Sequence, residues 1–201
     1  MPRIGRQIPH FTAVEPGSVK AEFSEDMRFR YLLSLKYGGG LYGEDRPESA
    51  AVVLKNPSAA DIHAADTTVR KVETYVHRHM PRVGRLCILN LFALRATDAA
   101  ELNQVYRMQG AEAVIGPGND ARIAAVLEGA DRIIVAWGNR SGIDAPFYEE
   151  RVRQLRELIL GRKKCRVYEV RGKKETAHPL HGMMWGYEHK LVPARLLNEG
   201  S

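Results

Sequence analysis

The sequence contains few cysteines and no long hydrophobic segment. Only two of its 201 residues are cysteine, Cys87 and Cys165, and both lie in apolar runs that are typical of buried strands. Two buried thiols without the spacing of a metal site argue against a disulfide-stabilised scaffold and favour a reducing compartment. No apolar run is long enough to span a bilayer, and Met1–Arg6 lacks an apolar signal core. We therefore expect a cytoplasmic protein with no membrane contact.

The chain also lacks the glycine-rich fingerprint of nucleotide-binding folds, internal repeats and low-complexity segments. The run Gly116-Pro117-Gly118 is by itself too weak a motif to indicate a bound nucleotide. Because no His, Cys, Asp or Glu residues recur with metal-ligand spacing, we expect no metal and no cofactor. The sequence likewise gives no reason to expect an obligatory protein partner.

Positive charge is in excess. The 30 Lys and Arg residues outnumber the 24 Asp and Glu residues, which gives a formal net charge of +6. Such an excess favours a polyanionic partner such as DNA, although many basic proteins bind no polyanion. The length suits a single domain, which we expect over residues 25–201. Residues 1–24 contain scattered Pro and Gly with little periodicity, and they are expected to form an irregular arm.

Short apolar runs alternate with helical patterns along the chain. This alternation is typical of an α/β fold, a three-layer αβα sandwich around a central, mostly parallel, four-stranded sheet. A partly alternating segment, Met27–Tyr37, predicts an additional half-exposed edge strand. Buried strands are expected at Val52–Leu54, Leu86–Phe92, Asp131–Trp137 and Cys165–Val170. Capping residues at Asp66-Thr67, Thr97-Asp98 and Asp144, together with apolar spacing, predict helices at Thr68–His79, Ala99–Met108, Ala121–Glu128 and Asp144–Leu160.

Polar clusters follow the expected strands directly. The first buried strand stops at Asn56-Pro57-Ser58, because proline cannot donate to a sheet ladder. Asn90, Gly138-Asn139-Arg140 and His178-Pro179 follow the other three strands. If the four strands run parallel, all four clusters meet at one edge of the sheet, which is where open α/β sheets bind ligands. One cluster alone is a routine strand-to-loop turn, whereas four around one crevice indicate a site.

Five motifs occur in order between Arg28 and His181. They are Val-Leu-Lys-Asn-Pro-Ser-Ala-Ala-Asp, Leu-Asn-Leu-Phe-Ala-Leu-Arg-Ala-Thr-Asp, Gly-Pro-Gly-Asn-Asp, Val-Ala-Trp-Gly and His-Pro-Leu-His. Together they resemble a bacterial domain family catalogued without an assigned function. That pattern is in turn similar to a remote branch of the uracil-DNA glycosylase superfamily. The resemblance implies the fold of that superfamily and hydrolysis of the bond between a base and its sugar in DNA.

The resemblance also implies roles for individual residues. Asn56 matches the Asn or Asp before a proline that handles the attacking water, and Asn90 matches the Asn that reads the base edge. His178 is similar to the histidine of the His-Pro-Ser motif, which stabilises the departing base. Leu54 and Ser58 stand where the superfamily has glycine, and Leu180 where it has serine. We therefore expect a modified base rather than uracil, for example a hypermodified cytosine of phage DNA in a defence system.

Other residues near these motifs have two interpretations each. Asp61 is either a carboxylate that assists Asn56 or a cap that anchors its loop. Pro57 and Ser58 are expected to border the base, and Phe92 either stacks on it or belongs to the core. Leu180 or Met183-Met184-Trp185 either fills the gap left by a flipped base or packs in the interior.

Basic side chains close to the strand ends are candidates for phosphate contacts, which would position DNA without reading its sequence. They are Lys55, Arg95, Arg140, Arg171, Lys173 and Lys174. His181 is either a further DNA contact or a structural histidine. Two other functions stay open at this point: a hydrolase of free nucleosides or nucleotides, and a module that binds modified nucleic acid without cutting it.

Overall fold

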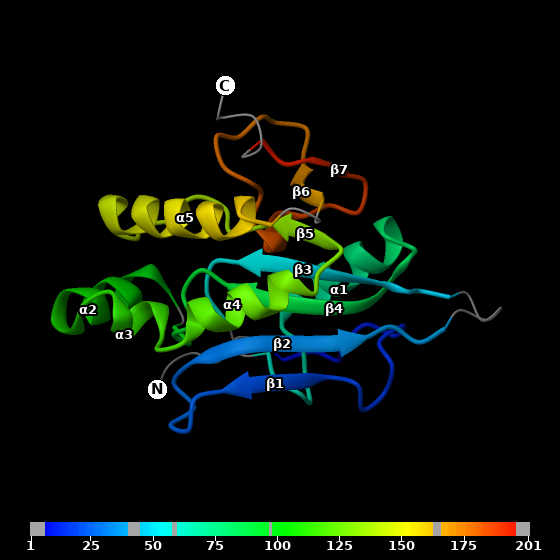
Figure 1. Cartoon of the computed structure of the whole chain (residues 1–201), viewed down its shortest axis with the longest axis horizontal. Helices are drawn as coiled ribbons and strands as arrows, with labels where there is room; N and C mark the ends of the chain where they lie inside the picture. Colours follow the sequence, from blue (N-terminus) through cyan, green and yellow to red (C-terminus); the bar gives the residue numbers. More distant parts are fainter. Residues whose placement is uncertain (1–6, 40–44, 58–59, 97, 163–165, 196–201) are drawn as a thin grey trace.

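The computed structural model describes residues 7–39, 45–57, 60–96, 98–162 and 166–195. Within them, a mixed seven-stranded sheet runs in the order β1-β2-β4-β3-β5-β6-β7 (Figure 1). The strands are β1 Lys20–Phe23, β2 Arg30–Lys36, β3 Glu48–Leu54, β4 Val83–Asn90, β5 Arg132–Val135, β6 Arg166–Arg171 and β7 Lys190–Pro193.

The centre of the sheet is parallel and its flanks are antiparallel. β3 pairs parallel to both β4 and β5, and β5 pairs parallel to β6, so the four expected strands form the predicted parallel core. The sheet is nevertheless larger than expected. β1 and β2 extend it antiparallel beside β4, and β7 extends it beside β6. β1 falls inside the segment 1–24, for which the sequence suggested only an irregular arm.

The strand expected at Met27–Tyr37 is present, but the expectation that it is half-exposed and lies at the edge of the sheet is wrong. This segment forms β2, but β1 covers its outer edge and β4 pairs with its inner edge. Leu33 and Leu35 are 0% and 1% exposed, and Arg30 is buried as well, with its Nη1 donating to the carbonyl oxygen of Ala60. Arg30 is therefore a buried hydrogen-bond donor rather than part of an exposed face, whereas Lys36 at the end of the strand is exposed.

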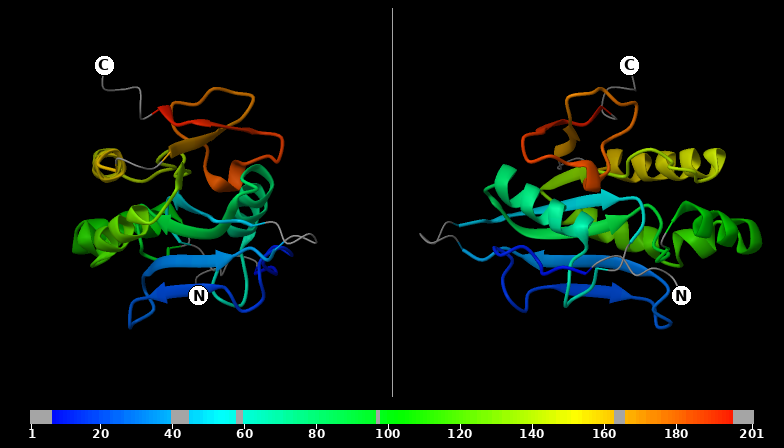
Figure 2. Two further views of the ribbon diagram at one scale, coloured as in Figure 1. Left: turned by 45° about the vertical axis from the view of Figure 1, so that its right-hand side comes forward. Right: turned by 180° about the vertical axis from the view of Figure 1, so that it is seen from behind.

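Helices cover both faces of the sheet, which gives three layers (Figure 2). One hydrophobic cluster joins one face to the last four of the five helices, whereas a second cluster joins the opposite face to the first helix and Trp185. Alternate residues of the central strands point to the two clusters, Val53 to the first and Val52 to the second. The helices are α1 Thr67–His79, α2 Ala99–Gln109, α3 Glu112–Ile115, α4 Asn119–Glu128 and α5 Ala145–Leu160.

Aspartate caps set where three of these helices begin, as the sequence predicts. Asp66 accepts hydrogen bonds from the backbone N–H groups of Thr68 and Val69. Asp98 caps α2 and Asp144 caps α5 in the same way. Each cap satisfies donors that the first helical turn leaves unpaired. No helix in the described part of the chain combines the length and apolarity that crossing a bilayer requires.

The segment after β6 returns to the centre of the molecule. It ends in a short 3-10 helix, η1 Gly182–Met184, which packs beside α1. A Cβ on Gly182 would lie 2.9 Å from Leu54 Cδ2 and 2.9 Å from Val72 Cγ2. Only glycine allows this approach, so the loop carrying His181 is held against the end of β3. The sequence left this segment unassigned.

Candidate active site

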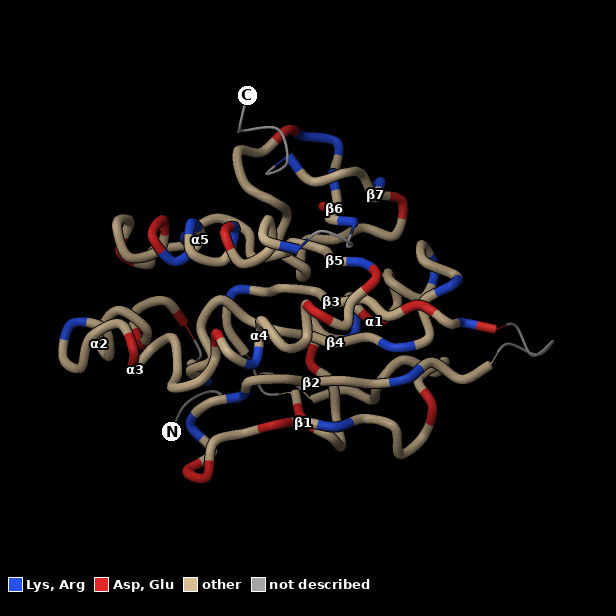
Figure 3. Tube along the Cα trace, in the orientation of Figure 1, with Lys and Arg blue, Asp and Glu red and all other residues tan. Residues whose placement is uncertain are grey.

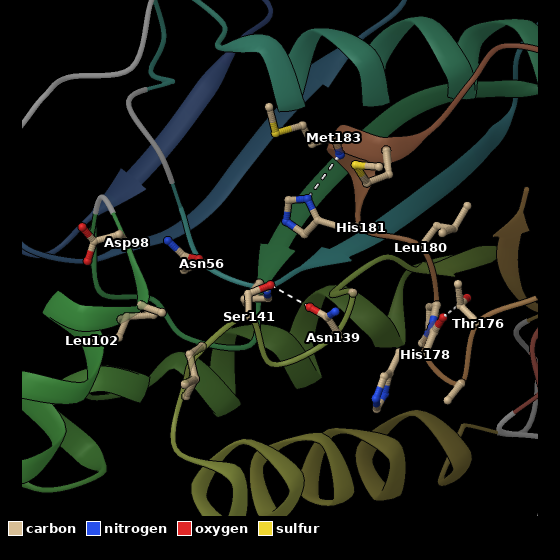
Figure 4. Close-up of a pocket in the computed structure, with 17 residues that line it drawn as sticks. Asn56, Asp98, Leu102, Asn139, Ser141, Thr176, His178, Leu180, His181 and Met183 are labelled. Atoms are coloured by element: carbon tan, nitrogen blue, oxygen red, sulfur yellow. Dashed lines mark hydrogen bonds between the residues drawn. The ribbon is translucent and has the colours of Figure 1, made fainter. Parts of the chain in front are cut away.

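A cleft of about 830 Å³ opens at the carboxyl ends of the parallel strands (Figure 4). The loops after β3, β5 and β6, the start of α2 and η1 form its walls. The lining residues include members of three of the four predicted clusters. They are Lys55, Asn56, Asp98, Ala99, Leu102, Gly138, Asn139, Ser141, Ile143, Thr176, Ala177, His178, Pro179, Leu180, His181, Met183 and Met184.

Asn56 is fixed by its amide nitrogen. Nδ2 donates to the carbonyl oxygen of Ala96 at 2.9 Å, and the side chain is half-buried. Among the described residues no hydrogen bond reaches its Oδ1. The amide is therefore held in one orientation and offers an acceptor to a ligand in the cleft.

His181 is the half-buried histidine of the cleft, whereas His178 is exposed. Burial, with a smaller contribution from the positive charge of Lys55, lowers its pKa to about 4, while the carboxylate of Asp66 opposes this shift. Its Nδ1 accepts the backbone N–H of Met183 at 3.3 Å. The ring is thus neutral at pH 7, and because Nδ1 is an acceptor, Nε2 carries the proton and is a hydrogen-bond donor.

His178 lines the same cleft from a different position. Its side chain is exposed, and its backbone carbonyl accepts a hydrogen bond from Thr176 Oγ1 at 2.6 Å. Figure 4 shows Asn56, Ser141 and His181 around one side of the cleft and His178 with Thr176 on the other. The structure thus brings Asn56 and His178 into one cleft, but His181 has the more enclosed imidazole.

Lys55 reaches into the cleft rather than toward solvent. It is 8% exposed, and its Nζ donates to Ser141 Oγ at 2.9 Å. Ser141 in turn donates to Asn139 Oδ1 at 2.7 Å. Burial lowers the pKa of Lys55 to about 8. No carboxylate of the described residues forms an ion pair with it, so this lysine differs from the exposed phosphate contact that the sequence suggested.

Ser141 has an unusual backbone conformation. Its φ of 49° lies in the left-handed region, which residues other than glycine seldom adopt. Such outliers concentrate at functional sites, where the surrounding structure holds them. Nothing in the sequence pairs Ser141 with Lys55, because the contact joins two loops that are far apart along the chain.

Asn90 lies outside the cleft. The strand pairing continues past β4, since the N–H groups of Leu91 and Phe92 donate to the carbonyls of Leu54 and Lys55. This pairing encloses Asn90 at 0% exposure. Neither its Oδ1 nor its Nδ2 has a hydrogen-bond partner among the described residues. The expected base-reading amide is therefore buried beside the site rather than open to it.

Phe92 and Asp61 take the structural alternatives that the sequence left open. Phe92 is 0% exposed and packs against Phe147, with ring centroids 5.2 Å apart. Asp61 Oδ1 accepts the backbone N–H groups of His63 and Ala64 at 2.8 and 3.0 Å, so it anchors its loop. Neither residue lines the cleft.

Pro57 is buried and does not line the cleft either. Ser58, also expected at the base, and Cys165, expected to begin the fourth strand, lie outside the described residues. Pro57 therefore adds nothing to the wall of the cleft.

Figure 3 shows Lys and Arg residues spread over the strands, helices and loops rather than gathered in one segment. Arg171 forms an ion pair with Glu169, and Arg95 donates to the carbonyl of Met27. Arg140 is exposed in the loop after β5. Lys173 and Lys174 are exposed in the loop that leads to His178. Lys173 and Lys174 are better placed for phosphate contacts than Arg95, Arg140 and Arg171, which have partners within the protein; Arg140 Nη1 donates to the carbonyl oxygen of Ile143 at 3.1 Å.

Three polar residues of the cleft were missed as functional candidates: Asp98, Ser141 and Thr176. Asp98 was predicted as a helix cap, and its Oδ1 accepts the N–H of Glu101 at 2.9 Å. A capping residue and a site residue have the same sequence pattern, so only the fold distinguishes them. Across the described ranges, no three His, Cys, Asp or Glu side chains group in a way that would hold a metal ion.

Comparison with known proteins gives one match. The family model described as "Protein of unknown function (DUF1643)" matches residues 30–180. No curated protein and no solved structure matches the chain. The matched region runs from the beginning of β2 to Leu180 in the wall of the cleft, and it includes Lys55, Asn56 and His178.

Proposed function

The chain belongs to the DUF1643 family, and we propose that it is a DNA glycosylase, which hydrolyses the N-glycosidic bond of a flipped-out base and leaves an abasic site. One observation carries this proposal: Asn56 and His181, distant in sequence, line the same cleft at the carboxyl edge of the parallel strands. On this hypothesis the mixed sheet is that of a uracil-DNA glycosylase-like core, extended by β1, β2 and β7.

Cleavage of an N-glycosidic bond makes two demands on a site. Positive charge develops on the sugar, where water must attack, and negative charge develops on the departing base. An amide is too weak a base to deprotonate water. Asn56 Oδ1 instead accepts a hydrogen bond from the water and orients it toward the sugar carbon, while the electron-poor sugar supplies the driving force. The hydrogen bond from Asn56 Nδ2 to the carbonyl oxygen of Ala96 fixes the amide in this orientation.

His181 supplies the second requirement. Its Nε2–H donates to an oxygen of the departing base, and this hydrogen bond strengthens as negative charge develops there. With a pKa of about 4 the neutral ring acts through its fixed dipole and transfers no proton. His178, which the motif resemblance implies for this role, lies exposed at the rim and is placed to contact a neighbouring nucleotide.

The dimensions of the cleft support a large base. Ligand sites commonly have volumes of roughly 300–1,000 Å³, and this cleft is near the upper part of that range at about 830 Å³. A base bearing a bulky substituent, such as a hypermodified cytosine of phage DNA, suits such a site. Excision of such a base would damage invading DNA and spare the host.

Two exposed methionines are candidates for the group that fills the space of the flipped base. Met183 and Met184 are 50% and 64% exposed at the rim of the cleft. Lys71 Nζ donates to the carbonyl of Met183 at 2.6 Å and so fixes η1 to α1. Trp185, 2% exposed, belongs to the core and is unsuited to the role. Apolar wedges of this kind separate stacked bases.

The test is to incubate the protein with DNAs that carry different normal and modified bases, and to detect released bases by mass spectrometry. Asn56→Ala and His181→Ala should each lower base release by about 100-fold, the typical effect of removing one transition-state hydrogen bond. His63→Ala is the matched control, because His63 is exposed outside the cleft. Full base release by both cleft variants would contradict the proposal.

A hydrolase of free nucleosides is the second candidate. Arg95 donates to the carbonyl of Met27, and Arg171 forms an ion pair with Glu169. Because both guanidinium groups have partners within the protein, fewer basic side chains are free to contact the phosphates of DNA, which favours a smaller substrate. DNA binding that falls steeply with rising salt would favour the polymer, since phosphate contacts release counterions. Turnover of free nucleosides with no action on DNA would favour the second candidate instead.

A further inference from the structure

We propose that Lys55 is an amine nucleophile and that the protein cleaves the DNA strand at the abasic site as well as removing the base. This proposal rests on the proposed function, because the abasic sugar is the aldehyde that the amine attacks. It names a chemical role for a side chain that the base-removal step leaves unused.

The placement of Lys55 is the first observation. A lysine that only contacts phosphate is exposed, with its ammonium group in water. Lys55 is 8% exposed and lines the cleft. It is the residue before Asn56, which orients water toward the sugar carbon in the proposed base-removal step. The amine and the site of glycosidic cleavage therefore share one cleft.

The partners of Lys55 are the second observation. Its Nζ donates to a neutral hydroxyl, Ser141 Oγ, at 2.9 Å. Because Ser141 donates its own proton to Asn139 Oδ1 at 2.7 Å, its oxygen is left as an acceptor for the amine. Ser141 is thus a positioning residue, and its left-handed φ of 49° is the backbone cost of this arrangement.

Protonation favours the role. With a pKa lowered to about 8 by burial, roughly a tenth of Lys55 is neutral at pH 7, compared with less than about a thousandth for an ordinary lysine. The other titratable groups that line the cleft are Asp98, His178 and His181. Desolvation by burial is the cause of the lowered pKa of Lys55, and the neutral ring of His181 adds no charge of its own.

The chemistry balances without an external oxidant or reductant. The Nζ lone pair attacks C1′ of the ring-opened abasic sugar, and the resulting carbinolamine loses one water to give a protonated imine. A base takes a proton from C2′, and the C3′–O bond breaks so that the 3′ phosphate leaves. Asp98, the carboxylate that lines the cleft, accepts that proton. One water then hydrolyses the imine, which frees Lys55 and an unsaturated aldehyde.

The experiment uses DNA with a preformed abasic site, so that it does not depend on base removal. Borohydride reduces the imine to a stable link between protein and DNA. Wild-type protein should form this adduct, and peptide mass spectrometry should locate it on Lys55. Lys55→Arg should lose the adduct, because arginine keeps the positive charge but provides no nucleophilic amine. Lys20→Arg, which changes an exposed lysine of β1 outside the cleft, should retain it.

Two further variants distinguish positioning from folding. Ser141→Ala should lower the rate of adduct formation and shift its pH profile, and Ser141→Thr, which keeps a hydroxyl, should restore both. Thermal melting of each variant reports its fold.

An adduct on other lysines, an adduct that persists in Lys55→Arg, or no adduct with wild-type protein would each overturn the role of Lys55. Failure of the glycosylase proposal has a different result, namely no free base from any DNA. Base release without an adduct would show a glycosylase that leaves the strand intact.

Discussion

Gly138 and His181 approach each other so closely that a Cβ on Gly138 would lie 2.9 Å from the Cβ of His181. Gly138 also has a φ of +73°, in the left-handed region. The Trp-Gly pair at the end of β5 is thereby explained, because any side chain at this position would displace the loop that carries the imidazole. The backbone at Gly138, just after β5, thus helps to set the position of His181, the proposed hydrogen-bond donor to the base.

Gly138→Ala should destabilise the protein by about 2–3 kcal/mol, because it adds a close contact with the Cβ of His181 to the cost of a left-handed alanine. It should also reduce base release, since His181 must move. Gly17→Ala is the matched control: Gly17 has a φ of +75° and a Cβ there would meet nothing within 4 Å. Urea denaturation of both variants measures the difference, and equal losses of stability would contradict the contact.

The neutral, half-buried His181 predicts a particular dependence of stability on pH. The unfolded histidine binds a proton near pH 6.5, whereas the folded one does so only near a pKa of about 4. Between these values the unfolded state holds more protons, so stability falls as the pH decreases, by up to about 1.4 kcal/mol per pH unit from this group.

His181→Gln should remove this part of the slope, as measured by urea denaturation across about pH 4 to 6.5. His10 is a useful contrast. Its pKa is raised by the hydrogen bond and charge of Glu73, which outweigh the lowering effect of burial. Its contribution is therefore present at low pH and lost as the pH rises. A slope unchanged in His181→Gln would show that this imidazole is not the group responsible.

Asn90 provides a test of the energetic cost of an unpartnered buried amide. Truncating a buried hydrogen-bonding side chain typically costs about 1–3 kcal/mol. Asn90→Ala should cost less than about 1 kcal/mol, because the amide atoms that it removes have no partners among the described residues. Asn119→Ala should have the full cost, since Asn119 Nδ2 donates to the carbonyls of Asn90 and Leu91. Equal costs in thermal unfolding would contradict this account.

Met183 and Met184 at the rim should affect the rate of base release from duplex DNA but not from single-stranded DNA. Met184→Ala should slow base release from duplex DNA by about 10-fold, because filling the gap of an extruded base offsets part of an unstacking cost of a few kcal/mol. Release from single-stranded DNA should be unchanged. Met108→Ala, which alters a methionine 73% exposed on α2, is the control. A similar effect on both substrates would remove the proposed wedge.

Local patterns in the sequence predicted much of this fold. The central strands are continuous apolar runs, and the helices begin at Asp66, Asp98 and Asp144, so periodicity and capping sufficed. β1 and β7 were missed because each is a short strand stabilised by pairing with a distant partner. The burial of β2 was missed for the same reason, since β1 provides its cover.

The candidate site was predicted in part. Parallel strands bring their carboxyl ends together, which placed Asn56 and His178 in one cleft. Asn90 was misjudged because strand pairing continues through Leu91 and Phe92 and encloses the amide. The contact between Lys55 and Ser141 was invisible in the sequence, since it depends on how two loops cross. The preference for His181 over His178 depends on burial, which the shared His-Pro-Leu-His motif does not reveal.

The central claim is that Asn56 and His181 act on the same glycosidic bond. The most direct measurement is the rate of base release, at saturating protein, by wild type, Asn56→Ala, His181→Ala and the double variant. Residues that act together in one transition state have non-additive effects. The account predicts that each single variant loses most of the activity and that the double variant is little slower than the slower single one. Base release at the wild-type rate in either single variant would contradict it.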